Sequence, residues 1–331
     1  MTELAFQSAL QLAEQIRNRS ISASEMLDYF LDRVERFNPD LNAIVVNDFD
    51  RAIETARQAD RDLAAGKSWG LLHGLPMTLK ESYDMAGLIT TRGNPLWKDN
   101  LCDTDALSVQ RLKALGVNIF GKTNVPFNLA DMQSYNEIYG TTNNPWDHSR
   151  APGGSSGGSA AALAAGLPGL ESGSDIGGSI RNPAHFCGVF GHKPTWGLLP
   201  PRGHAAPGVL AQSDLTVIGP LARSAADLEL ATLAMAGPDE IMSAGYQLSL
   251  APCPWTSLRD VKVAVWLNDA LAPVNEETRK RVRMIARAVR DAGGYVDEEA
   301  RPEFDVAEIH DNYQALLTAV MASRNSLEEY E

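Results

Sequence analysis

The sequence predicts an α/β fold in which a mixed β-sheet is covered by helices on both faces and follows a helical N-terminal region. From Leu71 onward, short apolar runs typical of strands alternate with segments whose apolar residues recur at helical spacing. Such alternation is typical of α/β proteins. Hydrophobic residues make up 44% of the 331 residues and charged residues 21%, which describes an ordinary globular chain.

The N-terminal region, residues 1–70, predicts helices with one strand between them. Ser22 and Glu25 form a capping box, which begins a helix, and Gly66 is placed to end another. The predicted elements are helices over 4–19, 22–37 and 50–65 and a strand over 43–46.

The rest of the chain supplies the strands of the sheet and the helices that cover it. A stretch rich in Pro, Gly and Ala over 200–213 predicts a long loop over the site. The predicted strands are 77–79, 117–120, 215–218 and 261–267, and the predicted helices are 106–115, 159–165, 225–236, 276–292 and 306–321.

Charge and composition exclude several classes of function. With 29 Lys and Arg against 42 Asp and Glu, the net charge of −13 argues against nucleic acid as a partner, and we expect no local basic block to compensate. The chain shows neither a signal-peptide pattern nor the run of about 18 apolar residues that a membrane helix needs. Its three widely spaced cysteines suit a reducing, cytoplasmic location.

Two motif matches lack the structural context that their chemistry needs. Residues 116–123 satisfy the letters of a phosphate-binding Walker A loop, but a helix precedes them and the residues between the glycines are strand-like. We therefore predict a helix-to-strand connection there, with Lys122 as a solvated charge. Residues 153–157 fit the nucleophile elbow of α/β-hydrolases, but no strand precedes them and no downstream histidine is marked as a base.

Glycine and serine concentrate in two clusters, 153–159 and 175–179, on either side of an alanine-rich helix. The consecutive glycines of the second cluster would let backbone N–H groups converge on one point, as an oxyanion hole requires. Spacing alone does not decide between such a hole, a phosphate cradle and ordinary tight turns.

Taken together, the motifs resemble those of the amidase signature family of serine hydrolases. The hallmark stretches are GGSSGGS (153–159), DIGGSIR (175–181) and GHKPT (191–195), and further matches are GLPMTLKES (74–82), GKTNVP (121–126) and TNNPW (142–146). The resemblance is dense over 71–227. Because relatives commonly continue well past this length, it implies a catalytic core over 71–331 that lacks its C-terminal part, with residues 1–70 packed on that core.

The resemblance implies a Ser-Ser-Lys triad. Ser179 matches the acyl-accepting nucleophile, Ser155 matches a bridging serine on a cis peptide bond, and Lys80 matches the base. A serine hydroxyl becomes a good nucleophile only when a base takes its proton, and a lysine can act as that base when burial keeps it neutral. The backbone N–H groups that match the family's oxyanion hole are those of Ile176, Gly177, Gly178 and Ser179.

The neighbours of the triad have structural interpretations. Ser156 and Ser159 are expected to hydrogen-bond the turn and cap the helix. Asp175 and Arg181 are expected to form an ion pair that holds the glycine turn. Cys187 is expected to be a buried small apolar residue.

We therefore expect an amidase without metal or cofactor that cleaves a carboxamide through an acyl-enzyme on Ser179. Its partner would be a small-molecule amide, with Met132 and Gln133 matching a pocket-lining segment of relatives, and a homodimer is left open. The alternatives are a component of an amidotransferase complex and an inactive binding protein with the same fold. Ile176 favours a general amidase, because the amidotransferase branch favours threonine at that position. The pocket walls that choose the substrate are not readable from these motifs.

Overall fold

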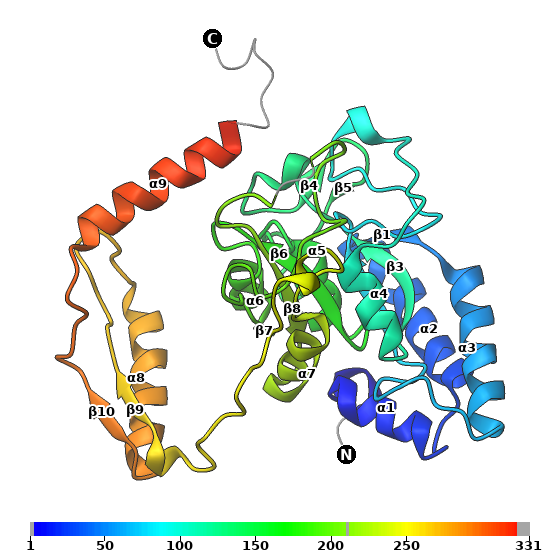
Figure 1. Ribbon diagram of the computed structural model, residues 1–331, viewed down its shortest axis with the longest axis horizontal. Coiled ribbons are helices and arrows are strands. Elements are labelled where there is room, and N and C mark those ends of the chain that lie inside the picture. The colour runs from blue at the N-terminus through cyan, green and yellow to red at the C-terminus, as the bar shows by residue number, and fades with distance from the viewer. Residues whose placement is uncertain (1–2, 210–211, 323–331) are drawn as a thin grey trace. The chain divides into compact units, whose positions relative to one another are not determined.

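The computed structural model describes residues 3–209 and 212–322 (Figure 1). The chain divides into two compact units between Leu248 and Ser249. The N-terminal helices belong to the first unit together with the strands that follow them, and each unit is described by itself.

The first two α-helices begin at capping boxes, and the sequence predicts the second of these. The predicted helix over 4–19 is divided, because Ser8 caps a new helix with Gln11 as its partner. The capping box of Ser22 and Glu25 is confirmed. The elements are η1 (Leu4–Phe6), α1 (Ala9–Arg17), α2 (Ala23–Leu41), β1 (Ile44–Asn47) and α3 (Phe49–Ala64).

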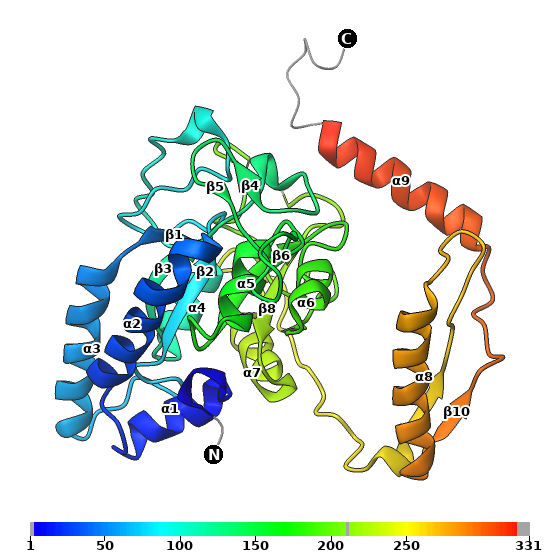
Figure 2. The same cartoon turned by 180° about the vertical axis from the view of Figure 1, so that it is seen from behind.

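The first sheet has the strand order β1-β3-β2, in which β3 (Asn118–Thr123) runs antiparallel to β1 and parallel to β2 (Pro76–Lys80). Every residue of β2 and β3 is buried. Helix α4 (Leu107–Ala114) lies between β2 and β3 in the chain, and α2 and α3 pack on the sheet, where both views show them together (Figure 2).

The second sheet has the order β6-β8-β7 and is antiparallel throughout. Backbone hydrogen bonds from Gly169 N to Pro76 O (2.9 Å) and from Thr78 N to Leu170 O (3.4 Å) join the chain entering β6 to β2. Strand β2 therefore lies beside the start of β6, and the mixed α/β fold class is confirmed. The strands are β6 (Glu171–Asp175), β7 (Phe190–Gly191) and β8 (Val217–Ala222).

Short elements complete the first unit. The predicted loop over 200–213 is irregular where the structure describes it, and residues 210 and 211 lie outside the described residues. The remaining elements are η2 (Pro95–Trp97), η3 (Phe127–Leu129), β4 (Tyr135–Asn136), β5 (Gly140–Thr141), α5 (Gly157–Ala164), α6 (Arg181–Cys187), α7 (Ala225–Met235) and η4 (Met242–Ala244).

The second unit is a βαβ arrangement followed by one helix. Strands β9 (Lys262–Ala264) and β10 (Tyr295–Asp297) pair in parallel and are connected through α8 (Glu276–Asp291). They are accompanied by η5 (Leu258–Asp260) and α9 (Val306–Ala322). Within the described residues, no helix is both long and apolar enough to span a membrane.

Helix α8 corrects one expectation about charge. The chain does contain a local basic block, and it lies on this helix. Ion pairs with Glu276, Glu277 and Glu298 offset part of its charge. The basic residues of α8 are Arg279, Lys280, Arg281, Arg283, Arg287 and Arg290.

Candidate active site

Three segments that are distant in sequence meet where β2 and β6, the edge strands of the two sheets, lie side by side. Strand β2 ends at Lys80, the cis peptide bond Gly154–Ser155 leads into α5, and β6 leads into the loop that carries Ser179. Glycine is needed at 154 because a Cβ atom there would lie 2.2 Å from the carbonyl oxygen of Gln133.

Lys80 is the centre of the polar contacts in this site. Its Nζ lies 2.7 Å from Ser155 Oγ and 3.0 Å from Ser174 Oγ. The relative exposure of Lys80 is 0%, that of Ser155 is 1% and that of Ser174 is 4%. The sequence interpretation missed Ser174. Its position directly before the DIGGS motif is the signal that could have identified it.

Ser179 lies where the buried site meets the surface. Its exposure is 5%, and its backbone carbonyl accepts a hydrogen bond from Ser156 N at 3.1 Å. This bond places the backbone that carries Ser179 against the residue that follows Ser155. In the part of the chain that the structure describes, no hydrogen bond involves the Ser179 hydroxyl. Catalytic hydrogen bonds often tighten only when substrate binds.

The loop between β6 and α6 changes the expected oxyanion set. The N–H of Gly178 donates to Asp175 Oδ1 at 2.9 Å, so this group is already engaged. The N–H groups of Ile176, Gly177 and Ser179 make no hydrogen bond within residues 3–209 and 212–322. These three groups are therefore the available donors of the predicted four.

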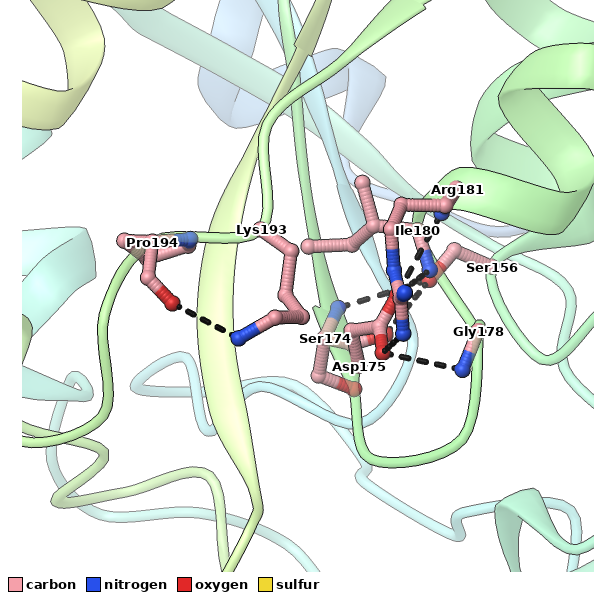
Figure 3. Close-up of polar contacts among 8 residues, drawn as sticks. All are labelled: Ser156, Ser174, Asp175, Gly178, Ile180, Arg181, Lys193 and Pro194. Carbon is pink, nitrogen blue, oxygen red and sulfur yellow. Dashed lines mark hydrogen bonds and ion pairs between the residues drawn. The ribbon is translucent and has the colours of Figure 1, made fainter. Parts of the chain in front are cut away.

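A buried carboxylate fixes the shape of this loop (Figure 3). Asp175 accepts hydrogen bonds from the N–H groups of Gly178 and Ile180 and forms an ion pair with Arg181, whose Nη2 lies 2.9 Å from Oδ1. Burial raises the pKa of Asp175, but the bonds from Arg181 and the two backbone groups outweigh burial and hold the pKa below its ordinary value. The carboxylate thus holds both ends of the glycine turn.

The two serines expected to cap α5 have other partners. Ser156 stands at the N-cap position but makes no side-chain cap; its Oγ bonds the backbone O and N of Ser174, each at 3.3 Å. Ser159 lies inside α5, and its Oγ lies 2.8 Å from Thr123 Oγ1. The capping expectation is wrong, because both buried hydroxyls instead form hydrogen bonds with the neighbouring strands β3 and β6.

Met132 and Gln133 lie beside the loops that carry the candidate residues Ser155 and Ser179. The Met132 methyl group lies 3.4 Å from the position that a Cβ atom on Gly178 would occupy, and the Met132 side chain is exposed. The backbone of Gln133 packs against Gly154. Both residues therefore border the loops that carry Ser155 and Ser179.

Two further ionisable side chains are buried near the site. Glu171 accepts hydrogen bonds from the Thr78 hydroxyl and from Ser172 N, and burial raises the pKa of its carboxyl to about 8. Lys122, expected to be solvated, is fully buried, as are the other residues of β3. Its Nζ donates to the backbone O of Ile89, and burial lowers the pKa of its ammonium.

The thiol of Cys187 is buried, which matches its structural interpretation. Cys187 has an exposure of 0%, and its thiol donates to Pro152 O at 3.3 Å. Burial raises the pKa of the Cys187 thiol to about 12, which disfavours the reactive thiolate.

Comparisons with known proteins show which family the chain resembles. A family model described as Amidase matches residues 25–328. The chain is 40% identical over 240 residues to a glutamyl-tRNA(Gln) amidotransferase subunit of Nitrosomonas eutropha, covering 72% of the chain and 48% of the relative. It is 42% identical over 236 residues to indoleacetamide hydrolase of Bradyrhizobium diazoefficiens, covering 70% of the chain and 45% of the relative.

Solved structures show the same fold. Fatty acid amide hydrolase matches with a TM-score of 0.87 and 27% identity, over 95% of this chain and 56% of that one. A bacterial aryl acylamidase matches with a TM-score of 0.83 and 26% identity, over 98% of this chain and 68% of that one. The chain spans about half the length of the curated relatives that it matches. On the family match, the shared motifs and the shared fold, the chain belongs to the amidase signature family.

Proposed function

We propose that this chain is a serine amidase that hydrolyses a carboxamide through an acyl-enzyme on Ser179. The observation that carries the proposal is the buried contact of 2.7 Å between Lys80 Nζ and Ser155 Oγ, beside the loop that holds Ser179. A lysine in direct contact with a serine, both shielded from water, can act as a base because burial favours its neutral form.

In the first step, Ser179 Oγ attacks the amide carbonyl carbon while its proton passes to Ser155. Ser155 gives its own proton to neutral Lys80, so the ammonium forms as the carbonyl oxygen becomes negative. The N–H groups of Ile176, Gly177 and Ser179 would stabilise that oxygen. The proton then returns from Lys80 through Ser155 to the amine nitrogen, and the C–N bond breaks.

In the second step, a water molecule takes the place of the departed amine. It loses a proton through Ser155 to Lys80 and attacks the acyl carbon, and Ser179 leaves with the returned proton. The acid product is released and the starting protonation states are restored. We further propose a small-molecule amide or carbamate as substrate and a cytoplasmic location.

A second candidate is a role as one component of an amidotransferase complex. It is favoured by the 40% identity to the glutamyl-tRNA(Gln) amidotransferase protein of Nitrosomonas eutropha, which is comparable to the identity to indoleacetamide hydrolase. In that role the same chemistry would release ammonia for use by partner proteins. Ile176 in the nucleophile motif favours the first candidate.

The test is mass spectrometry of the purified chain mixed with amides and carbamates of different acyl size. We expect an acyl adduct on Ser179, loss of turnover in Ser179→Ala and Lys80→Ala, and full activity in the exposed control Ser149→Ala. Full turnover in both site variants would refute the triad. Turnover of glutamine only after partner proteins are added would favour the amidotransferase role.

A further inference from the structure

A cavity that the proposed mechanism does not use lies in the first unit, at the far end of α5 from Ser155 and Ser179. Its volume is about 340 Å³, within the range typical of small-ligand sites. Helix α5 begins directly after Ser156, whereas the cavity is lined by Ala164 and Ala165 at its other end. Eight helical residues span about 12 Å, so the cavity is separate from the triad.

We propose that this cavity binds a small organic cation, an amine carrying an aryl or alkyl group. Its walls include the aromatic rings of Phe6, Phe37 and Trp146, which come from three separate segments of the chain. Aromatic faces attract ammonium groups and also pack against apolar bodies. The same walls carry the carboxylate of Asp40.

The rings of this cavity already hold one cation. The Arg33 guanidinium lies 5.3 Å from the ring centre of Phe6 and 5.0 Å from that of Phe37. Its Nη1 donates to Glu3 at 2.7 Å, and its other nitrogens donate to the carbonyl oxygens of Ala165 and Gly166, each at 2.8 Å. Because these partners occupy the guanidinium, Arg33 does not supply a site for an anion.

One carboxylate in the cavity wall lacks an ion-pair partner among the described residues. Asp40 forms no ion pair with any residue that the structure describes, and Arg36, one turn earlier, lies over the Phe37 ring instead, 4.9 Å from its centre. Helix α2 ends at Leu41, which also lines the cavity, and the C-terminus of a helix carries partial negative charge. A cationic group of a ligand can pair with the Asp40 carboxylate, which would repel an anionic group.

Trp146 offers the apolar body of such a ligand a fixed surface. Its exposure is 75%, yet its indole N–H donates to Cys187 O at 2.8 Å and its backbone N–H to Asn144 Oδ1 at 2.9 Å. An exposed aromatic ring that is already held in place loses little freedom when a ligand packs on it. The cavity thus combines a fixed ring with the carboxylate of Asp40.

The test is calorimetric titration of the Ser179→Ala chain with phenethylammonium, using 2-phenylethanol and 3-phenylpropanoate as neutral and anionic probes. His148 also lines the cavity, so all three probes are compared at one pH. We expect one site for phenethylammonium, with the two other probes binding at least ten-fold more weakly. Equal binding of the neutral probe, or no binding of the amine at millimolar concentration, would overturn the proposal.

Variants decide whether the amine binds here or at the catalytic site. Asp40→Asn and Trp146→Ala change exposed side chains, and each is expected to weaken phenethylammonium binding about ten-fold, while Asp99→Asn and Trp196→Ala, also exposed, leave it unchanged. Circular dichroism checks that every variant is folded. If the first pair binds the amine as tightly as the second pair, the cavity is not the site.

Discussion

Replacing Glu171 with Gln should change how the stability of the first unit depends on pH. The pKa of Glu171 rises from its ordinary value of 4.5 to about 8 because the side chain is fully buried. At pH values between these two pKa values, the folded chain keeps the Glu171 proton, whereas the unfolded chain has released it. The free energy of unfolding therefore falls as pH rises through this window, whereas Gln, which does not titrate, escapes the loss.

The size of the effect follows from the shift. At about 1.4 kcal/mol per pKa unit, the full rise corresponds to at most about 5 kcal/mol above pH 8. Urea denaturation at pH 5, 6, 7, 8 and 9 would give the difference in unfolding free energy between Glu171→Gln and the parent chain. We expect that difference to move in favour of the variant up to about pH 8 and then level off.

A matched control separates this effect from other titrating groups. Glu35 is exposed on α2, so Glu35→Gln should show a difference that does not vary over the same pH range. A difference for Glu171→Gln that is equally flat between pH 5 and 8 would show that Glu171 is ionised in the folded chain and would refute the reasoning.

Three further predictions concern the site and the cysteines. Activity should fall as pH decreases because Lys80 must be neutral to accept a proton, and a rate that stays constant from about pH 9 to about pH 5 would count against a lysine base. Ser174→Ala removes a contact of 3.0 Å to Lys80 Nζ and should lower kcat about ten-fold with little change in KM; an unchanged kcat in steady-state assays would contradict this. Iodoacetamide should label exposed Cys253 well before buried Cys187, and peptide mass spectrometry showing the reverse order would disprove the burial argument.

Much of the fold is readable from local pattern. The helices over 106–115, 225–236, 276–292 and 306–321 form with their ends shifted by at most one residue. Strand β6, in contrast, was not predicted, because its sequence ESGSD has no β-branched or aromatic residue. It is a strand because β2 and β8 bury it on either side, a tertiary effect that a local pattern does not contain.

The candidate site was readable only in part for a similar reason. The motifs mark Lys80, Ser155 and Ser179 as candidates, but the contact of Ser174 with Lys80 depends on how β6 lies beside β2. The engagement of the Gly178 N–H by Asp175 depends on the shape of the turn. Lys122 was misjudged because a lysine is normally solvated, and only the packing of β3 shows that this one is not.

The sequence separation within the site has a consequence for how the protein refolds. Lys80 is 75 residues from Ser155 and 94 residues from Ser174, so the site depends on contacts that close long loops. Such contacts form slowly because the entropy of loop closure is lost before they stabilise the chain. Helical signal, which depends on local contacts, should return early after dilution from denaturant, whereas catalytic turnover should return only when the two sheets have met.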